Sequence, residues 1–289
     1  MTDASFGIAT APQQVDYVDL LRVWREADAI GEIEHAWLFD HLMPISGDGQ
    51  GPIFEGWTLL AALAAQTSRL RLGLLVTSNR IRPPAVLAKI ATTVDVVSGG
   101  RLEFGIGAGS RTAIPEARRE YDAYGLPYVD FADSVGALAE ACTVIKRLWT
   151  ETAPFDFDGR HVQLAGAFAN PKPVQRPHPP ILIAGRTSSV LHVVAEHADI
   201  WNIAGVEIDD AAARSALLER YCADIGRDSA SITRSTNVPV AYDDPAATRH
   251  AVGAALDAGF RHIVLSLQAP YPDGIARWVT DEIITPSSG

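Results

Sequence analysis

The sequence predicts a (β/α)₈ barrel, also called a TIM barrel, as its fold class. Three observations lead to this prediction: strand-like and helix-like segments alternate along the 289 residues, eight strand-like segments occur, and each is nearly continuous in apolar character. Parallel strands covered by helices on both faces have this composition. Eight such units favour a barrel over two Rossmann halves. No internal repeat or convincing linker occurs, so we expect residues 1–289 to form a single domain.

Each expected strand is a short apolar run between polar or turn-forming residues. The first contains Phe6 and Ile8, and the second contains Trp37 and Phe39. In chain order the expected strands are residues 6–9, 36–39, 70–76, 102–106, 181–184, 200–203, 237–242 and 262–267.

The expected helices are segments in which apolar residues recur at helical spacing. They are residues 15–30, 57–67, 85–98, 133–149, 188–197, 210–225 and 245–258. The helix over 85–98 carries a stripe made of Val86, Ile90, Val94 and Val97, and Gly99-Gly100 ends it. Asp133 is the predicted N-cap of the next helix.

Two connections interrupt the simple alternation. Residues 107–132 contain prolines, aromatic residues and a charged patch over 116–122. Residues 152–180 are rich in proline and irregular, and we interpret their last part as a rigid lead-in to the strand at 181–184.

Charge and composition exclude several classes of protein. The net charge of −11 argues against a nucleic-acid partner, because such binding needs a basic face. The sequence contains no run of about 20 uncharged apolar residues, so we expect no membrane partner. No signal peptide is visible, and Cys142 and Cys222 do not indicate a disulfide framework. Two buried thiols fit a reducing compartment, so a cytoplasmic location is expected.

The active site of a (β/α)₈ barrel lies at the carboxyl ends of the strands, so the residues after each strand are the candidates. Asp40 and His41 follow the second strand, and Thr77, Ser78 and Asn79 follow the third. An acid beside an imidazole suits general acid–base chemistry, but the same pair is often a local hydrogen-bond device.

A glycine loop follows the fifth strand and consists of Gly185, Arg186, Thr187 and Ser188. Backbone N–H groups and hydroxyls at a helix start form a ready site for an anion, so phosphate binding and simple capping are both open here. The glycine run at 105–109 does not fit a dinucleotide fingerprint, because it comes late in the chain and Pro115 prevents a helix from starting directly after it.

Other chemistries find no support in the sequence. The eight histidines are scattered and no Cys-x-x-Cys pair occurs, so no metal site is expected. A Gly-x-Ser-x-Gly elbow and a phosphate-binding P-loop are both missing from the sequence.

Several segments together resemble the luciferase-like monooxygenase family, in particular its branch that uses the deazaflavin coenzyme F420. They follow the order of the family and span residues 6–202, about two thirds of the chain. The matching segments are FDHLMPI, LGLLVTSNRIRPPAVLAKIATTVDVVSGGRLEFGIGAG, VIKRLWTE, FDGRHVQL, PKPVQRPHPPILIAG and ADIWN.

The resemblance implies a luciferase-like (β/α)₈ barrel with a short or absent late insertion, usually assembled as a homodimer. It implies an oxidoreductase that moves a hydride between coenzyme F420 and a small organic substrate. A monooxygenase that uses reduced FMN is the alternative, and a flavin- or deazaflavin-binding protein without catalysis is a third possibility. Arg80, Arg82 and Arg111 favour a cofactor with a long anionic tail, which the deazaflavin has.

The resemblance also assigns catalytic roles. His41 matches a histidine near the reactive ring, and Asp40 is expected to orient this imidazole or its loop. Ser110 stands where the sugar-phosphate dehydrogenase branch has a catalytic glutamate, so the role of that acid is unfilled and a sugar phosphate is in doubt as the substrate.

The cofactor-binding residues are assigned by the same resemblance. The bulge that backs the ring is matched by Leu74, Leu75 and Val76, within which a non-prolyl cis peptide is expected; Thr77 and Asn79 come directly after it. A turn that contacts the cofactor is matched by Ala108 and Gly109. The loop that holds the phosphate is matched by Gly185 and Arg186, and the hydroxyls of Thr187 and Ser188 follow directly after it.

Overall fold

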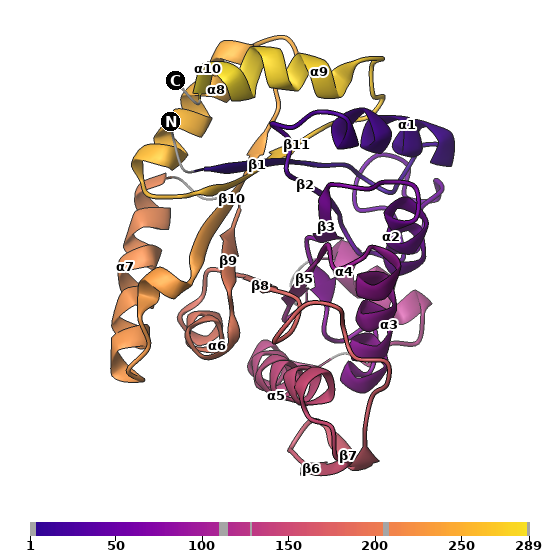
Figure 1. Ribbon diagram of the computed structural model, residues 1–289, viewed down its shortest axis with the longest axis vertical. Coiled ribbons are helices and arrows are strands. Elements are labelled where there is room, and N and C mark those ends of the chain that lie inside the picture. Colours follow the sequence, from indigo (N-terminus) through magenta and orange to yellow (C-terminus); the bar gives the residue numbers. More distant parts are fainter. Residues whose placement is uncertain (1–3, 110–114, 128, 205–207, 288–289) are drawn as a thin grey trace.

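The computed structural model describes residues 4–109, 115–127, 129–204 and 208–287. Its central feature is a sheet of parallel strands that closes on itself and is surrounded by helices (Figure 1). The eight positions of the barrel are occupied by β1 (Ser5–Ala9), β2 (His35–Leu38), β3 (Arg71–Leu74) with its short continuation β4 (Thr77–Ser78), β5 (Leu102–Gly107), β8 (Ile181–Ala184), β9 (Ile200–Ile203), β10 (Thr233–Pro239) and β11 (His262–Ser266).

The pairing of the strands closes the barrel. Hydrogen-bonded neighbours follow the order β3, β2, β1, β11, β10, β9, β8, β5, and β3 also pairs with β5. At this closure Leu72 lies opposite Leu102 and Gly73 lies opposite Glu103. All of these pairs are parallel, so the predicted (β/α)₈ barrel is confirmed.

The surrounding helices lie close to the predicted segments. They are α1 (Tyr17–Asp28), α2 (Gly56–Ala64), α3 (Pro84–Val97), α5 (Phe131–Thr150), α6 (Ser188–His197), α7 (Ile208–Asp224) and α8 (Pro245–Asp257). A short 3₁₀ helix, η1 (Ser229–Ser231), precedes β10, and the chain ends in α9 (Ile275–Val279), the π-helical turn η2 (Thr280–Ile284) and α10 (Thr285–Ser287). No helix of the described residues is both long and apolar enough to cross a bilayer.

Helix α5 begins earlier than predicted. Asp130 is its N-cap, and the Asp130 carboxylate accepts a hydrogen bond of 2.8 Å from the backbone N–H of Asp133. The prediction of Asp133 as the N-cap was therefore wrong. Asp133 lies in the first turn instead, where its negative charge still favours the helix N-terminus.

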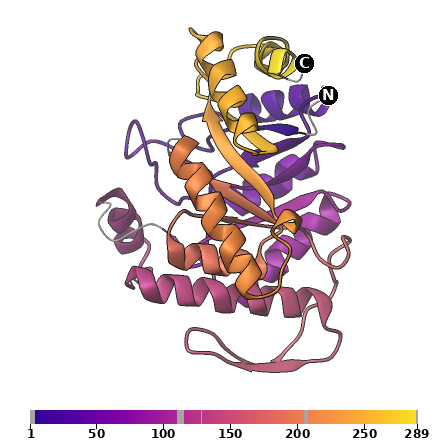
Figure 2. The ribbon, with the colours of Figure 1, turned by 90° about the vertical axis from the view of Figure 1, so that its left-hand side faces the viewer.

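Two segments that were predicted as irregular contain regular structure. Helix α4 (Pro115–Ala123) lies in the connection after β5. Strands β6 (Phe155–Asp158) and β7 (Gln163–Ala167) form an antiparallel hairpin that projects beyond α5 (Figure 2). Their sequences lack a long apolar run, because most side chains of β7 are exposed or half-exposed.

Strand β10 begins four residues earlier than predicted. The prediction missed its first half because those residues are polar. Ser235 donates or accepts a hydrogen bond of 2.8 Å with Nδ1 of His262, and the Asn202 amide donates to Ser235 Oγ at 2.9 Å. These contacts lie among strands β9, β10 and β11. A search for apolar runs misses a strand whose buried side chains hydrogen-bond to one another.

The interior of the barrel has a polar layer and an apolar layer. Near the strand N-termini the rings of His35 and His262 stack with centroids 3.8 Å apart, and Glu103 Oε2 lies 3.4 Å from His262 Nε2. Two residues further along β2 and β11, Trp37 and Val264 pack in an apolar cluster. The Trp37 indole donates to Nδ1 of His35 at 2.7 Å, which joins the two layers.

Glycines allow β3 and β5 to approach closely where the barrel closes. A Cβ atom at Gly105 would lie 1.9 Å from the carbonyl oxygen of Leu74, and one at Gly73 would lie 2.3 Å from that of Glu103. Both distances are far below van der Waals contact, so a larger residue requires the backbone to move.

The stripe predicted on α3 is only partly buried. Val94 is 1% exposed, but Val86 and Val97 are 51% and 48% exposed. The buried face is formed by the neighbouring residues Leu87, Ala88, Ala91 and Val94. Helix α3 therefore has a second apolar face that points away from the barrel core.

Candidate active site

A cavity of about 300 Å³ lies at the carboxyl ends of the strands. Its lining comes from the segments after β2, β3 and β5, from the end of β8 and from helix α4. The residues are Phe39, Asp40, His41, Leu75, Val76, Ser78, Ile81, Gly107, Ala108, Gly109, Glu120, Tyr121 and Ala184.

The apolar wall of the cavity comes from the bulge between β3 and β4. The peptide bond between Leu75 and Val76 is cis, as the sequence predicted for this bulge. Both side chains line the cavity, whereas Leu74 is fully buried in the core. Beyond the bulge, Thr77 and Ser78 resume the pairing with β5.

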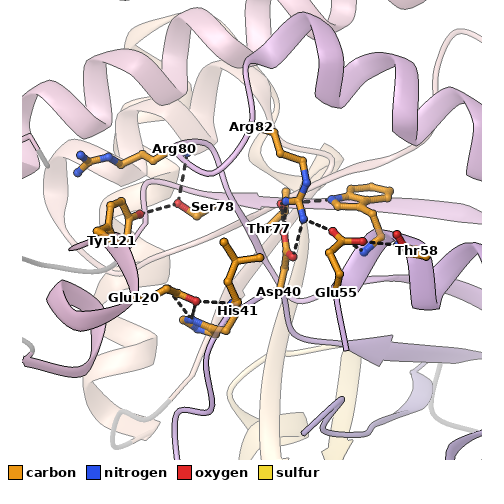
Figure 3. Close-up of polar contacts among 12 residues, drawn as sticks. Asp40, His41, Glu55, Thr58, Thr77, Ser78, Arg80, Arg82, Glu120 and Tyr121 are labelled. Carbon is orange, nitrogen blue, oxygen red and sulfur yellow. Dashed lines mark hydrogen bonds and ion pairs between the residues drawn. The ribbon is translucent and has the colours of Figure 1, made fainter. Parts of the chain in front are cut away.

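His41 is paired with a carboxylate from helix α4 (Figure 3). Its Nδ1 lies 3.1 Å from Oε2 of Glu120 and 3.3 Å from Oε1. The backbone N–H groups of Leu42 and Met43 also donate to Oε1 of Glu120, the latter at 3.3 Å. The side chain of Glu120 is 4% exposed, so two backbone N–H donors and the imidazole of His41 converge on a buried carboxylate.

The charge of Glu120 is stabilised by these donors. Burial raises the pKa of its carboxyl group, but the contact with His41 and the backbone hydrogen bonds from Leu42 and Met43 outweigh burial and hold the pKa below its ordinary value. Glu120 is therefore an ionised hydrogen-bond acceptor at neutral pH.

Asp40 belongs to a separate network. Arg82 binds its carboxylate in a bidentate manner, with N–O distances of 2.6 and 3.0 Å, and the hydroxyl of Thr77 donates to it as well. Arg82 also pairs with Glu55, the N-cap of α2. The contacts of Asp40 are with this network, whereas the imidazole of His41 contacts Glu120, so Asp40 fixes the loop rather than the ring.

The same network sets the charge state of Arg82. Burial lowers the pKa of its guanidinium, but the hydrogen bonds and charges of Asp40 and Glu55 outweigh burial and raise this pKa above its ordinary value. A buried, bidentate arginine–carboxylate pair of this kind fixes geometry strongly.

Two residues that were predicted to bind the cofactor, Thr77 and Asn79, face away from the cavity. The hydroxyl of Thr77 is completely buried, donates to Asp40 and receives a hydrogen bond of 3.3 Å from Trp57 Nε1. The amide of Asn79 is buried between α5 and the end of β5, where its oxygen accepts a hydrogen bond of 2.9 Å from the Leu138 N–H and its nitrogen donates to the carbonyl of Gly107 at 3.0 Å. Ser78, between them, lines the cavity instead.

Ser78 and Tyr121 supply the remaining polar groups of the cavity. Their hydroxyl oxygens are 3.1 Å apart, and the guanidinium carbon of Arg80 lies 5.0 Å from the centre of the Tyr121 ring. Arg80 also donates to the carbonyl of Val129 and to Ser134 Oγ. The contact between Tyr121 and Ser78 ties helix α4 to the end of β4 (Figure 3), and the contacts of Arg80 with Val129 and Ser134 reach the start of α5.

The turn after β5 leaves room beside the apolar wall. Gly107, Ala108 and Gly109 all line the cavity. A Cβ atom at Gly107 would lie 2.9 Å from Val76, and one at Gly109 would lie 2.7 Å from Ser78 Oγ. The small residues and the apolar wall fit a planar flavin or deazaflavin ring. Ser110 and Arg111 lie outside the described residues.

The loop after β8 begins at the cavity, which Ala184 lines. The Gly185 N–H donates to the carbonyl of Asn202 at 3.1 Å, and Thr187 is the N-cap of α6. Ser188 Oγ lies 2.6 Å from the hydroxyl of Tyr221 on α7. Gly185, Arg186, Thr187 and Ser188 are therefore contiguous with the cavity through Ala184 but do not line it.

Sequence reasoning missed Glu120 and Tyr121. The charged patch at 116–122 was visible, but its contact with His41 joins residues 79 positions apart. A helix placed after β5 would have been the signal, because every connection after a strand reaches the same face of the barrel. Among the described residues, no group of three His, Cys, Asp or Glu side chains could hold a metal ion.

Known proteins resemble this chain in sequence and in fold. A family model described as luciferase-like monooxygenase matches residues 3–277. The chain is 30% identical over 179 residues to the pyrimidine monooxygenase RutA of Acinetobacter baylyi, which covers 60% of this chain and 46% of that protein. It is 31% identical over 183 residues to a phthiodiolone/phenolphthiodiolone dimycocerosates ketoreductase of Mycobacterium bovis, which covers 62% of this chain and 45% of the relative.

The chain spans less than half the length of both relatives. Among solved structures, an F420-dependent secondary alcohol dehydrogenase in complex with an F420–acetone adduct superposes over 100% of both chains, with a TM-score of 0.84 and 17% identity. At this identity the superposition demonstrates a shared fold, the luciferase-like barrel.

Proposed function

The chain belongs to the luciferase-like monooxygenase family, and from this premise we propose that it is a flavin- or deazaflavin-dependent oxidoreductase. More specifically, we propose that its cofactor is coenzyme F420 and that it transfers a hydride to or from a small organic substrate. The observation that carries this proposal is the composition of the cavity: an apolar wall at Leu75 and Val76 together with the imidazole–carboxylate pair of His41 and Glu120.

This pair fits the oxidation of an alcohol or the reduction of a ketone. When bound, the deazaflavin takes up or gives the hydride, and the proton of the substrate hydroxyl must move separately. His41 is the neutral-pH candidate for accepting that proton from an alcohol or returning it to a carbonyl. Leu75 and Val76 would back the ring and exclude water from it, while Asp40 and Arg82 hold the loop that carries His41.

The names of the similar proteins support this direction. One relative is a ketoreductase, and the superposed structure is a secondary alcohol dehydrogenase. The anionic tail of the cofactor is proposed to bind at Gly185, Arg186, Thr187 and Ser188, which continue from the cavity through Ala184. The side chains of Thr77 and Asn79 are buried behind the cavity lining, and we do not propose that they contact the ring.

A reduced-FMN monooxygenase is the second candidate. The observation in its favour is the pyrimidine monooxygenase among the relatives. The imidazole–carboxylate pair of His41 and Glu120 argues for the first candidate. A monooxygenase that inserts oxygen into its substrate with a reduced flavin does not by itself require a proton acceptor for a substrate hydroxyl.

Titration of the protein with oxidised coenzyme F420 and, separately, with FMN tests the choice of cofactor. We expect saturable changes in absorbance and fluorescence at micromolar F420 and much weaker binding of FMN. A screen of secondary alcohols that follows F420 reduction then tests the reaction. Tight FMN binding with oxygen consumption, and no F420 binding, would contradict the proposal.

We also propose a homodimer in the cytoplasm. Cys142 and Cys222 are free and buried, which fits a reducing compartment.

A further inference from the structure

Glu120 comes from helix α4, whereas His41 follows β2, and the two meet only in the folded barrel. An ionised carboxylate has acceptor atoms only, so the atom it contacts at 3.1 Å must carry the proton. That atom is Nδ1 of His41. In the neutral imidazole, a proton on Nδ1 leaves Nε2 with a lone pair.

The ring of His41 is held on a second side as well. Phe39 packs edge-on against it, with ring centroids 5.7 Å apart and planes at 68°. The side chain of His41 is 27% exposed and lines the cavity, and within the described parts of the chain only Nδ1 makes a hydrogen bond. The ring therefore has one nitrogen engaged by the protein and one available to a ligand.

We infer that Glu120 is a positioning residue that holds His41 in the tautomer with its proton on Nδ1, so that Nε2 faces the substrate as a proton acceptor. The use of Nε2 by an alcohol rests on the proposed function, but the tautomer does not. Glu120 thereby supplies a carboxylate that the residue at position 110, a serine, does not offer. This carboxylate comes from helix α4, and it acts through the imidazole of His41 rather than directly on the substrate.

A purely structural role for Glu120 is the competing explanation, since the carboxylate also binds the N–H groups of Leu42 and Met43. Glu120→Gln separates the two roles. The glutamine oxygen can still accept from both backbone N–H groups, whereas its amide N–H₂ would meet Nδ1 of His41 and donate to it. This substitution therefore keeps the loop and reverses the tautomer.

The decisive measurement is ¹⁵N–¹H NMR of the histidine side chains in the apo protein, read from the neutral form of His41. We expect the Nδ1–H form in the native protein and the Nε2–H form in E120Q, with the melting temperature of E120Q close to native. Asp122→Asn on the same helix, 64% exposed, is the matched control and should leave the tautomer unchanged.

An Nε2–H tautomer in the native protein, or an unchanged Nδ1–H tautomer in folded E120Q, would overturn the inference. The native spectrum alone decides this if E120Q does not fold. If alcohol oxidation is established, E120Q should lower the hydride-transfer rate by at least about tenfold, because the proton acceptor is lost. The expected tautomers together with no F420-dependent activity would refute the proposed function and leave the inference about Glu120 standing.

Discussion

At the scale of single residues, His41 connects the proposed chemistry to the chain. Replacing it by alanine removes the only imidazole that lines the described cavity, and general acid–base help is worth about 10²–10⁴ in rate. We expect His41→Ala to slow single-turnover hydride transfer by at least about tenfold while F420 affinity stays within a few-fold.

The exposed His250 on α8 is the control, and His250→Ala should leave both quantities unchanged. If His41 only packs at the end of β2, the folded fraction of the mutant would turn over at the native rate with the native pH profile. That result would remove the catalytic role.

Arg186 tests the location of the cofactor's anionic tail. Arg186→Ala should weaken F420 binding at low ionic strength, and the loss should shrink at high salt, because salt screens an exposed charge contact. Arg160→Ala, which removes a side chain that is 77% exposed in another loop, serves as the control. Equal affinity of native protein and Arg186→Ala at low salt would place the tail elsewhere.

The sequence located the residues of the site better than it predicted their contacts. Asp40 and His41 line the cavity because they follow a strand of a parallel barrel, which is a local signal, whereas Leu75, Val76, Ala108 and Gly109, which also line it, were assigned by the family resemblance. The pairing of Asp40 with Arg82 and of His41 with Glu120 depends on where two connections meet, which no local pattern specifies. Thr77 and Asn79 follow the same strand but face its other side, since alternate residues of a strand point in opposite directions.

At the scale of elements, the contact between β3 and β5 depends on glycine. Gly105→Ala places a methyl group 1.9 Å from the Leu74 carbonyl, and the backbone must move to admit it. We expect a loss of about 1–3 kcal/mol or more in the free energy of unfolding, measured by urea denaturation.

Gly253 in α8 provides the contrast for Gly105. A Cβ atom at Gly253 would meet no atom within 4 Å, so Gly253→Ala should be neutral or stabilise the helix by roughly 0.5–1 kcal/mol. Similar stability of both variants would show that the close approach of β3 and β5 is not required.

Elements with an apolar signal were predicted well, and elements without one were not. Seven strands coincide with the predicted runs to within a few residues, whereas β10 begins in a polar run because Ser235 is satisfied by Asn202 and His262. Helix α4 is too polar to show an apolar stripe, and it is stabilised by tertiary contacts such as that of Tyr121 with Ser78.

At the scale of the whole molecule, the polar layer inside the barrel makes stability depend on pH. Burial, and then repulsion by His262, holds the pKa of His35 well below its ordinary value. Burial raises the pKa of Glu103, but His262 and Arg71 outweigh burial and lower it to about 2. The 3.4 Å separation between Glu103 Oε2 and His262 Nε2 is not a well-directed hydrogen bond.

The direction of the pH effect is set by both groups. The contribution of His35 to stability is fully present above its unfolded pKa of about 6.5. As the pH falls below that value, the unfolded chain binds a proton that the folded state does not, so this contribution is lost. Glu103 contributes stability above about pH 4.5, lost as the pH falls toward 2. We expect the free energy of unfolding to fall between pH 7 and 5, by roughly 1.4 kcal/mol per pH unit for His35.

Chemical denaturation at several pH values measures this slope. His35→Asn should flatten the slope, whatever its effect on absolute stability, and His250→Asn should not. An unchanged slope in His35→Asn would mean that other groups dominate the acid response.

The proposed homodimer is a second property of the whole molecule. Val86 and Val97 lie on one face of α3, both about half-exposed, beside a groove of about 670 Å³ that Trp57, Ala61 and Ile90 line. A second copy would cover this apolar face. Light scattering should give twice 31.0 kDa, and Val86→Lys with Val97→Lys should give the monomer mass.

Ile225→Lys is the control for this pair, because Ile225 is 50% exposed and follows α7, across the barrel from α3 in Figure 1. A native protein that is monomeric at micromolar concentration would contradict the dimer.

The contacts of Glu120 with residues 41–43 also bear on attempts to redesign the protein. The carboxylate from the connection after β5 accepts hydrogen bonds from backbone groups of the connection after β2, so the two loops stabilise each other. Loop exchange with a relative should therefore succeed only when both segments are transplanted together. A chimera that receives a foreign segment 107–132 alone would leave the N–H groups of Leu42 and Met43 without their acceptor. The unit to exchange is therefore the pair of loops.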